Sequence, residues 1–236
     1  MKGLVKYARG EGNVEIREVA EPFPGPGQVK IEVKAAGICG SDVHILKDDI
    51  AIPIRPPVVI GHEFSGVIAA LGEGVSGWNI GERVSSETAF HVCGHCEYCR
   101  TGNPHVCKER RPIGFYYNEA FAKYIIMPAQ NVHRLPENVD FIGGALCEPL
   151  SVITHGVIEI SRVLPGDNVL VSGAGAIGLL AAQVARCHGA RVIISGTSAD
   201  ENRFTVAKSL GFEELVNVEK ADVKKIVAEI TGGRGM

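Results

Sequence analysis

Four of the seven cysteines in this 236-residue chain fall within one short stretch, HVCGHCEYCRTGNPHVC. Successive cysteines are separated by two, two and seven residues, and turn formers such as Gly94, Gly102 and Pro104 lie between them. Short spacers of this kind let a tight turn present four thiolates to one tetrahedral zinc ion, with no coordination position left open. We therefore predict a structural zinc site formed by Cys93, Cys96, Cys99 and Cys107.

Two other uses of these cysteines fit the sequence less well. A disulfide framework requires an oxidising compartment, but the N-terminal MKGLVKYARG lacks the apolar core of a secretory signal, and seven cysteines leave one unpaired. A thioredoxin-like centre uses one C-x-x-C beside a βαβ unit, whereas this stretch has two that overlap. His91, His95 and His105 lie among the cysteines and are expected at solvated loop positions.

A second chemical motif is the run GAGAIG at residues 173–178, which matches G-x-G-x-x-G. It follows NVLVS, a predicted strand, and opens LLAAQVA, a predicted helix, as a dinucleotide-binding turn requires. The glycines allow a tight turn, a close backbone approach to pyrophosphate at the helix N-terminus, and close helix–strand packing. The predicted cofactor contacts are Gly173, Gly175, Ala176, Ile177 and Gly178.

The end of the next predicted strand bears on the choice of cofactor. An acid usually follows the glycine run by ~20 residues and binds the ribose 2′-OH, but Gly196 occupies that position. Thr197, Ser198 and Arg203 come next and could bind a 2′-phosphate. This pattern slightly favours NADP, while Asp200 leaves NAD possible.

Three other stretches contain ligands suited to a second, catalytic zinc, which keeps about three protein ligands and one open position. One Cys, one His and one Glu would satisfy such an ion. The stretches lie far apart, so their spacing alone does not establish a shared site, and each residue also has an ordinary structural role open to it. The candidates are Cys39 in GICGSDVH, His62 and Glu63 in GHEFSG, and Cys147 and Glu148 in ALCEPLSV.

The elements that position these residues change character near residue 150. Before it, alternating segments such as QVKIEVKAAGI, EFSGVIAALG, GERVSS and AFAKYIIMPAQNVHRLP predict short strands separated by turns. After it, apolar strands alternate with helical patterns, which is typical of βαβ units and a parallel sheet. We predict a β-rich domain over residues 1–150, with a zinc lobe at about 91–108, and an α/β dinucleotide-binding domain over residues 151–236.

Composition limits the partners of the chain. It is 45% hydrophobic and 22% charged, as in globular proteins, and its net charge is −3 without a basic run. Nucleic acids and anionic membranes are therefore poor candidate partners. The longest uncharged run, residues 168–185, is interpreted as a strand, a turn and a helix rather than a membrane span. We expect a cytoplasmic enzyme that acts on a small molecule.

Taken in order, GICGSDVH, GHEFSGVI, GERV, the cysteine stretch, EPLSV and GAGAIG resemble the zinc-dependent medium-chain dehydrogenase/reductase family. The combination of GICGSDVH with EPLSV looks most like the polyol branch, the sorbitol and xylitol dehydrogenases, and is also similar to threonine and butanediol dehydrogenases. The resemblance implies a GroES-like N-terminal domain, a Rossmann domain, an alcohol or polyol substrate, and a homo-oligomeric intact enzyme.

The resemblance also implies roles for individual residues. The alcohol would bind at a catalytic zinc, Ser41 would accept its proton with His44 as a candidate next carrier, and hydride would pass to NAD(P). The product would be a ketone, or an aldehyde from a primary alcohol. The four-cysteine stretch corresponds to the family's structural zinc. The implied ligands of the catalytic zinc are Cys39, His62 and either Glu63 or Glu148.

Two alternatives stay open. Family members extend beyond the point that corresponds to Met236, so we expect only the first half of a Rossmann domain, and the chain could be a non-catalytic zinc-binding fragment. The other alternative is a zinc-free quinone reductase of the same fold. The cysteine stretch, together with Cys39, His62 and Glu148, argues against that alternative.

Overall fold

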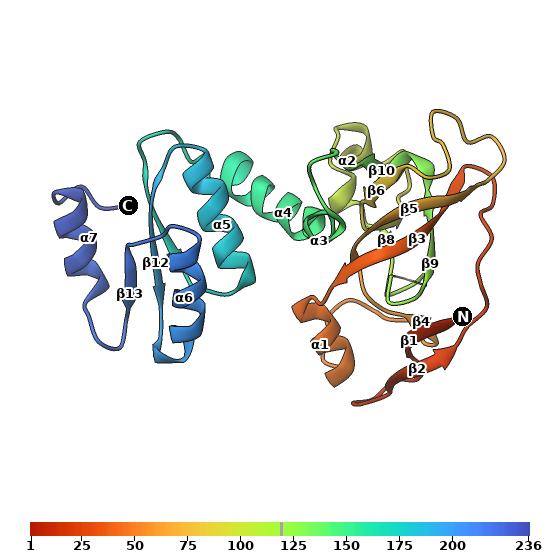
Figure 1. Ribbon diagram of the computed structural model, residues 1–236, viewed down its shortest axis with the longest axis horizontal. Coiled ribbons are helices and arrows are strands. Elements are labelled where there is room, and N and C mark those ends of the chain that lie inside the picture. The colour runs from red at the N-terminus through yellow and green to blue at the C-terminus, as the bar shows by residue number, and fades with distance from the viewer. Residues whose placement is uncertain (119) are drawn as a thin grey trace. The chain divides into compact units, whose positions relative to one another are not determined.

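The computed structural model describes residues 1–118 and 120–236, which form two compact units, Met1–Glu148 and Pro149–Met236 (Figure 1). Two clusters of buried apolar side chains lie in the first unit, one including Ile31 and the other including Ile45. A third cluster, which includes Ile194, lies in the second unit. Each unit therefore has a hydrophobic core of its own.

A five-stranded antiparallel sheet forms the main part of the first unit. In the order of the sheet, its strands are β10 (Val132–Arg134), β6 (Arg83–Ser86), β5 (Glu63–Leu71), β3 (Gln28–Gly37) and β9 (Tyr124–Pro128). Apolar side chains of β3 and β5 form the core, and Ile31 and Ile68 are fully buried. At Gly66 a side chain would collide with the backbone carbonyl of Glu32 on β3, so glycine permits the close approach of these two strands.

The segment AFAKYIIMPAQNVHRLP forms two strands, β9 and β10, separated by a short 3₁₀ turn, η2 (Ala129–Asn131). Although the strands are neighbours in sequence, they lie at the two ends of the strand order. The predicted pair of alternating strands is therefore present but is not a hairpin.

A smaller sheet and several short elements complete the first unit. The sheet has the order β2 (Val14–Glu18), β1 (Lys2–Lys6) and β4 (Val58–Val59). Residues 1–150 were predicted to be rich in strands, but no individual strand was identified before residue 28 from the sequence. Lys6, at the end of β1, is fully buried, and its Nζ donates to the carbonyl of Gly10 at 2.6 Å, so this strand does not show a simple apolar pattern. The remaining elements are α1 (Gly40–Lys47), β7 (Ala89–His91), α2 (Glu97–Arg100), η1 (Pro104–Val106), β8 (Arg111–Pro112) and α3 (Phe141–Ala145).

The second unit is a parallel sheet with helices between its strands. The sheet has the order β11 (Asn168–Ser172), β12 (Arg191–Gly196) and β13 (Leu215–Asn217), and both pairings are parallel. Ile193 and Ile194 of β12 are fully buried, as expected of the central strand. This arrangement confirms the predicted change from antiparallel strands to βαβ units. The helices are α4 (Cys147–Thr154), whose first two residues belong to the first unit, the π-helical turn η3 (His155–Ile160), α5 (Ala176–Cys187), α6 (Glu201–Ser209) and α7 (Val223–Thr231). A 3₁₀ turn, η4 (Ser198–Asp200), precedes α6.

The long uncharged run at residues 168–185 divides into β11, a glycine turn and most of α5. In the part of the chain that the structure describes, no helix has both the length and the apolar character needed to cross a membrane.

Candidate zinc and dinucleotide sites

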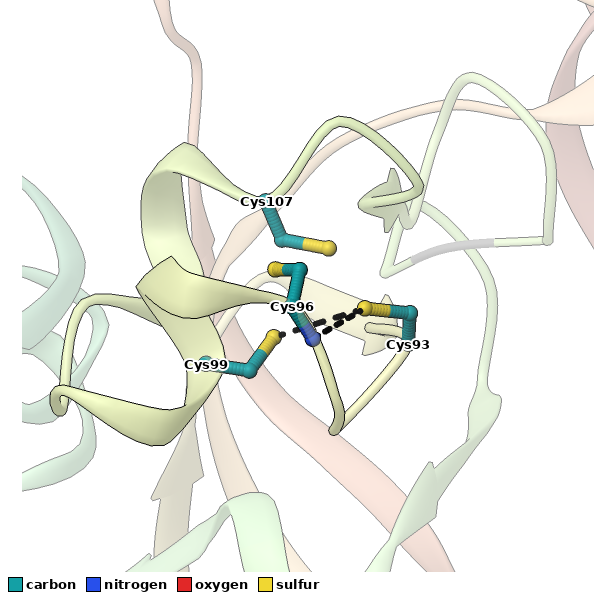
Figure 2. A group of neighbouring side chains, drawn as sticks. All are labelled: Cys93, Cys96, Cys99 and Cys107. Atoms are coloured by element: carbon teal, nitrogen blue, oxygen red, sulfur yellow. Dashed lines mark hydrogen bonds between the residues drawn. The ribbon is translucent and has the colours of Figure 1, made fainter.

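Four cysteine side chains converge in the lobe between β7 and β8 (Figure 2). Their sulfur atoms all lie within 4.8 Å of one another, and the Sγ atoms of Cys93 and Cys99 are 3.9 Å apart. Tetrahedral zinc with Zn–S distances of ~2.3 Å would hold its sulfurs about 3.8 Å apart. The cluster therefore has the dimensions of a four-thiolate zinc site. Its members are Cys93, Cys96, Cys99 and Cys107.

Short helical turns bring these sulfurs together. Cys96 precedes α2, and its backbone N–H donates to Cys93 Sγ at 3.3 Å, while Cys107 follows η1. Neither α2 nor η1 contains a buried residue. Apolar packing therefore does little to stabilise the lobe, and a bound metal would supply the missing cross-link.

The thiols of this cluster differ in acidity. Hydrogen bonding to the backbone of Cys93 lowers the pKa of Cys107 to about 7. Burial, reinforced by hydrogen bonds among the neighbouring thiols, raises the pKa of Cys99 to about 12. The raised pKa of Cys99 would not prevent metal binding, because a thiol that coordinates a metal ion is deprotonated. Four soft donors at these distances fit zinc.

A second group of potential ligands lies where α1 and β5 begin. Ligand atoms of Cys39, His62 and Glu63 lie within 4.8 Å of one another. Gly37 pairs with Glu63 across β3 and β5, which brings the residue before α1 close to the first residue of β5. A side chain at Gly37 would displace the Glu63 carboxylate from its present position. A thiolate, an imidazole and a carboxylate leave one tetrahedral position for a substrate, as in catalytic zinc sites.

Asp42, which was not among the predicted site residues, contacts two of these potential ligands. The side chain is 5% exposed, its Oδ2 accepts the Cys39 backbone N–H at 2.9 Å, and its Oδ1 lies 4.0 Å from His62 Nδ1. Burial raises the pKa of Asp42, whereas the Cys39 N–H and the charge of His62 act in the opposite direction. The available signal was the acid three residues after Cys39, the spacing of a capping box.

Ser41 and His44, the predicted proton carriers, both lie on α1. Ser41 Oγ is 3.4 Å from His62 Nε2, so this hydroxyl is next to a potential zinc ligand. His44 is mainly exposed, and its Nδ1 lies 2.9 Å from Asp49 Oδ1. The structure thus brings Ser41 to the ligand group and pairs His44 with Asp49, just beyond the end of α1.

Glu148 lies in the first turn of α4. Burial raises its pKa, and the negative charge of Glu63 raises it further, while His62 and Arg110 lower it. These interactions indicate that Glu148 is near the ligand group. Among the described residues, however, it is Glu63 and not Glu148 that belongs to the set within 4.8 Å.

The predicted dinucleotide loop joins β11 to α5. Gly173 has a φ of +105°, which favours glycine, and Gly175 is the N-cap of α5. A side chain at Gly178 would collide with the carbonyl of Gly173. Ala176 and Ile177 form the first turn of the helix, where unpaired backbone N–H groups are suited to a pyrophosphate.

The residues after β12 surround an acid whose position the sequence left open. The Asp200 carboxylate accepts hydrogen bonds from the backbone N–H of Thr197 at 2.9 Å and from Arg203 Nη1 at 2.7 Å. The backbone N–H of Ser198 donates to Glu219 at 2.9 Å. Thr197, Ser198 and Arg203, which were predicted to bind a 2′-phosphate, therefore donate hydrogen bonds to the carboxylates of Asp200 and Glu219.

Comparison with known proteins identifies the family to which this chain belongs. Residues 25–137 match the alcohol dehydrogenase GroES-like domain, and residues 176–236 match the zinc-binding dehydrogenase domain. A sorbitol dehydrogenase of Halalkalibacterium halodurans is 46% identical over 235 residues, which are 100% of this chain and 68% of that protein. The chain belongs to the zinc-containing alcohol dehydrogenase family.

Other alcohol dehydrogenase relatives act on different substrates. A D-arabitol-phosphate dehydrogenase of Enterococcus avium is 38% identical, over 100% of this chain and 67% of that protein. An L-threonine 3-dehydrogenase of Xanthomonas euvesicatoria is 39% identical, over 98% of this chain and 67% of that protein. The chain thus spans about two thirds of the length of these curated relatives.

Solved structures of the family include complexes with both nicotinamide cofactors. A zinc-binding dehydrogenase from Sinorhizobium meliloti 1021, bound to NADP, is 34% identical with a TM-score of 0.87 over 99% of this chain and 66% of that one. An alcohol dehydrogenase from Escherichia coli CFT073, complexed with NADH, is 35% identical with a TM-score of 0.86 over 98% of this chain and 66% of that one. The family therefore does not decide the cofactor.

Membership of the alcohol dehydrogenase family confirms the predicted fold and enzyme class. The chain has a GroES-like antiparallel domain followed by the parallel strands and helices of a partial Rossmann domain. The roles of individual site residues stay predictions, which the geometry above now makes specific.

Proposed function

We propose that this chain carries the zinc sites and the dinucleotide loop of a dehydrogenase that oxidises a secondary alcohol or polyol to a ketone with NAD(P). The observation that carries the proposal is the convergence of Cys39, His62 and Glu63 beside Ser41, in a chain that also has a strand–glycine loop–helix unit. A sorbitol-type polyol is the first candidate substrate because the sorbitol dehydrogenase relative is more similar than the threonine dehydrogenase relative.

The proposed zinc positions differ in function. The four-cysteine lobe would hold a structural ion, because four thiolates leave it no open position. The other ion would be held by Cys39, His62 and Glu63. Glu148 is proposed to act from outside the ligand set, since it interacts electrostatically with His62 and Glu63 but lies beyond their 4.8 Å group.

The proposed chemistry assigns each nearby side chain a task. A zinc ion bound at the catalytic position supplies a Lewis acid that lowers the pKa of the substrate hydroxyl. Ser41, whose Oγ lies 3.4 Å from His62 Nε2, would relay the hydroxyl proton, accepting it while passing its own proton towards solvent, with the exposed His44 as the candidate next carrier. Asp42 would orient two ligands through its contacts with Cys39 and His62. The glycine loop would hold the pyrophosphate and thereby orient the nicotinamide that receives hydride.

The metal content of matched cysteine variants tests the two-site arrangement. We expect two zinc ions per wild-type chain and one in each of Cys39→Ser and Cys99→Ser, measured by elemental analysis after dialysis with zinc. A wild type that holds a single ion, lost only in Cys99→Ser, would contradict the catalytic site.

Turnover separates a dehydrogenase from a non-catalytic zinc-binding fragment. Sorbitol, xylitol, butanediol and threonine should be assayed with NAD and with NADP, following cofactor reduction. We expect oxidation of a polyol by the wild type and its loss in Cys39→Ser. Threonine as the only substrate oxidised would replace the polyol assignment with the alternative family activity.

A further inference from the structure

The acid usually found at the end of the second strand of a dinucleotide fold is replaced here by Gly196, and the space beside this glycine is filled. A Cβ atom on Gly196 would meet Asp200 Oδ2 and Phe204 Cζ, each at 3.0 Å. These distances are shorter than ordinary van der Waals contacts. Glycine at this position therefore makes room for a carboxylate that comes from four residues further along the chain.

Hydrogen bonds hold Asp200 in this place. Its Oδ2 accepts the backbone N–H of Thr197 at 2.9 Å and the Thr197 hydroxyl at 3.1 Å. Its Oδ1 accepts from Arg203 Nη1 at 2.7 Å. The Asp200 side chain is only 13% exposed, whereas that of Arg203 is 61% exposed. A carboxylate accepts about four hydrogen bonds, so Asp200 retains acceptor capacity for a ligand hydroxyl.

A second carboxylate comes from the segment after β13. Gly196 pairs with Asn217 in the parallel ladder, which brings Glu219 close to the end of β12. Glu219 Oε2 accepts the backbone N–H of Ser198 at 2.9 Å. The backbone donors of Thr197 and Ser198, which could otherwise cradle a phosphate, are thus both bound to carboxylates.

Both carboxylates are anionic at neutral pH. Hydrogen bonding from the Thr197 backbone, with Arg203, lowers the pKa of Asp200 below its usual range. Hydrogen bonding from Ser198 lowers the pKa of Glu219. Arg203 is engaged by Asp200, and Lys220 pairs with Glu201 at 3.0 Å. Among these five side chains the acids Asp200, Glu201 and Glu219 outnumber the bases Arg203 and Lys220. The local charge is therefore unfavourable to another anion.

This acidic group lies next to the predicted pyrophosphate loop. Ser172 and Ser195 are partners in the β11–β12 ladder, and the Gly173 N–H donates to the Ser195 carbonyl at 2.8 Å. The two strand ends are therefore adjacent at the carboxyl edge of the sheet. In a dinucleotide fold, the adenosine ribose binds at this edge, between the glycine loop and the end of the second strand.

We propose that Asp200, reinforced by the negative charge of Glu219, is the specificity-determining acid of the cofactor site and selects NAD over NADP. The ribose 2′-OH of NAD can donate to Asp200, whereas the 2′-phosphate of NADP would face two carboxylates and an arginine that is already paired. This proposal rests on the proposed function, because it requires that the chain bind a nicotinamide dinucleotide. It reverses the slight preference for NADP that Gly196, Thr197, Ser198 and Arg203 suggested in the sequence.

Titration of the 236-residue chain with NADH and NADPH, by calorimetry, tests the selection directly. We expect NADH to bind the wild type about tenfold more tightly than NADPH. Asp200→Asn keeps an acceptor for the Thr197 N–H but removes the charge, and it should reduce this ratio by about fivefold or more, mainly through tighter NADPH binding. The matched control is Glu214→Gln, which removes an acid that pairs with Arg191 at the opposite end of β12 and should leave the ratio within about twofold.

The possible outcomes separate the inference from the proposed function. NADPH binding as tightly as NADH to the wild type, or an equal effect of Glu214→Gln and Asp200→Asn, would overturn the inference and leave the dehydrogenase assignment intact. Binding of neither cofactor would contradict both. Thermal melting checks the fold of each variant. If Asp200→Asn does not fold, Glu219→Gln replaces it, because this variant should also reduce the ratio of NADH affinity to NADPH affinity.

Discussion

At the scale of single residues, Asp42 shows how one buried acid can organise two potential metal ligands. It accepts the Cys39 backbone N–H and lies 4.0 Å from His62 Nδ1, so its loss would leave the orientation of both ligands less constrained. We predict that Asp42→Asn lowers the zinc affinity of the catalytic site by about 10–100-fold and leaves the four-cysteine site unchanged. Competition with a chromophoric chelator measures both sites in one titration. Asp49→Asn, which removes only the partner of His44, is the matched control. Equal zinc loss in the two variants would mean that Asp42 has no positioning role.

At the scale of elements, we expect the lobe between β7 and β8 to depend on its proposed metal, because α2 and η1 contain no buried residue. We predict that Cys99→Ala removes one zinc ion, exposes the amides of residues 91–108 to rapid hydrogen exchange and lowers Tm. A loss of about 2 kcal/mol would lower the Tm of a unit of this size by roughly 4–8 °C. Cys187→Ala, at an exposed position on α5, should change none of these quantities. Slow exchange in the lobe of zinc-free Cys99→Ala would show that local packing is sufficient without the metal.

At the scale of the whole molecule, the two units have separate apolar cores, and we expect each to unfold as its own cooperative transition. A zinc chelator should lower the transition of Met1–Glu148 and leave that of Pro149–Met236 in place. Calorimetry of two matched core variants identifies the transitions. Ile68→Ala and Ile194→Ala each truncate a fully buried side chain, and each should cost its own unit about 2–5 kcal/mol. A single transition that both variants shift equally would contradict independent folding.

Much of the fold and two of the motifs could be predicted from sequence because they depend on short spacings. The four cysteines lie within one lobe, and residues 168–187 form a strand, a glycine turn and a helix, so local turn chemistry is sufficient to specify them. Alternation predicted most strands of the main antiparallel sheet. It did not predict β1, where a buried Lys6 interrupts the pattern, or β2, which is largely exposed. It also did not predict the separation of β9 from β10, because the pairing of each strand depends on the other strands of the sheet.

The composition of the sites beyond those motifs was decided only by the tertiary structure. Cys39 and Glu63 become neighbours because Gly37 pairs with Glu63 across two strands, and this pairing, rather than any spacing in the chain, favours Glu63 over Glu148. The cofactor site follows the same rule. The sequence has Gly196 where an acid is usual, but the loop after β12 folds so that the Asp200 carboxylate lies beside Gly196. A sequence determines directly what its own neighbouring residues can form, but contacts between distant residues depend on strand register and loop path, which many weak interactions set together.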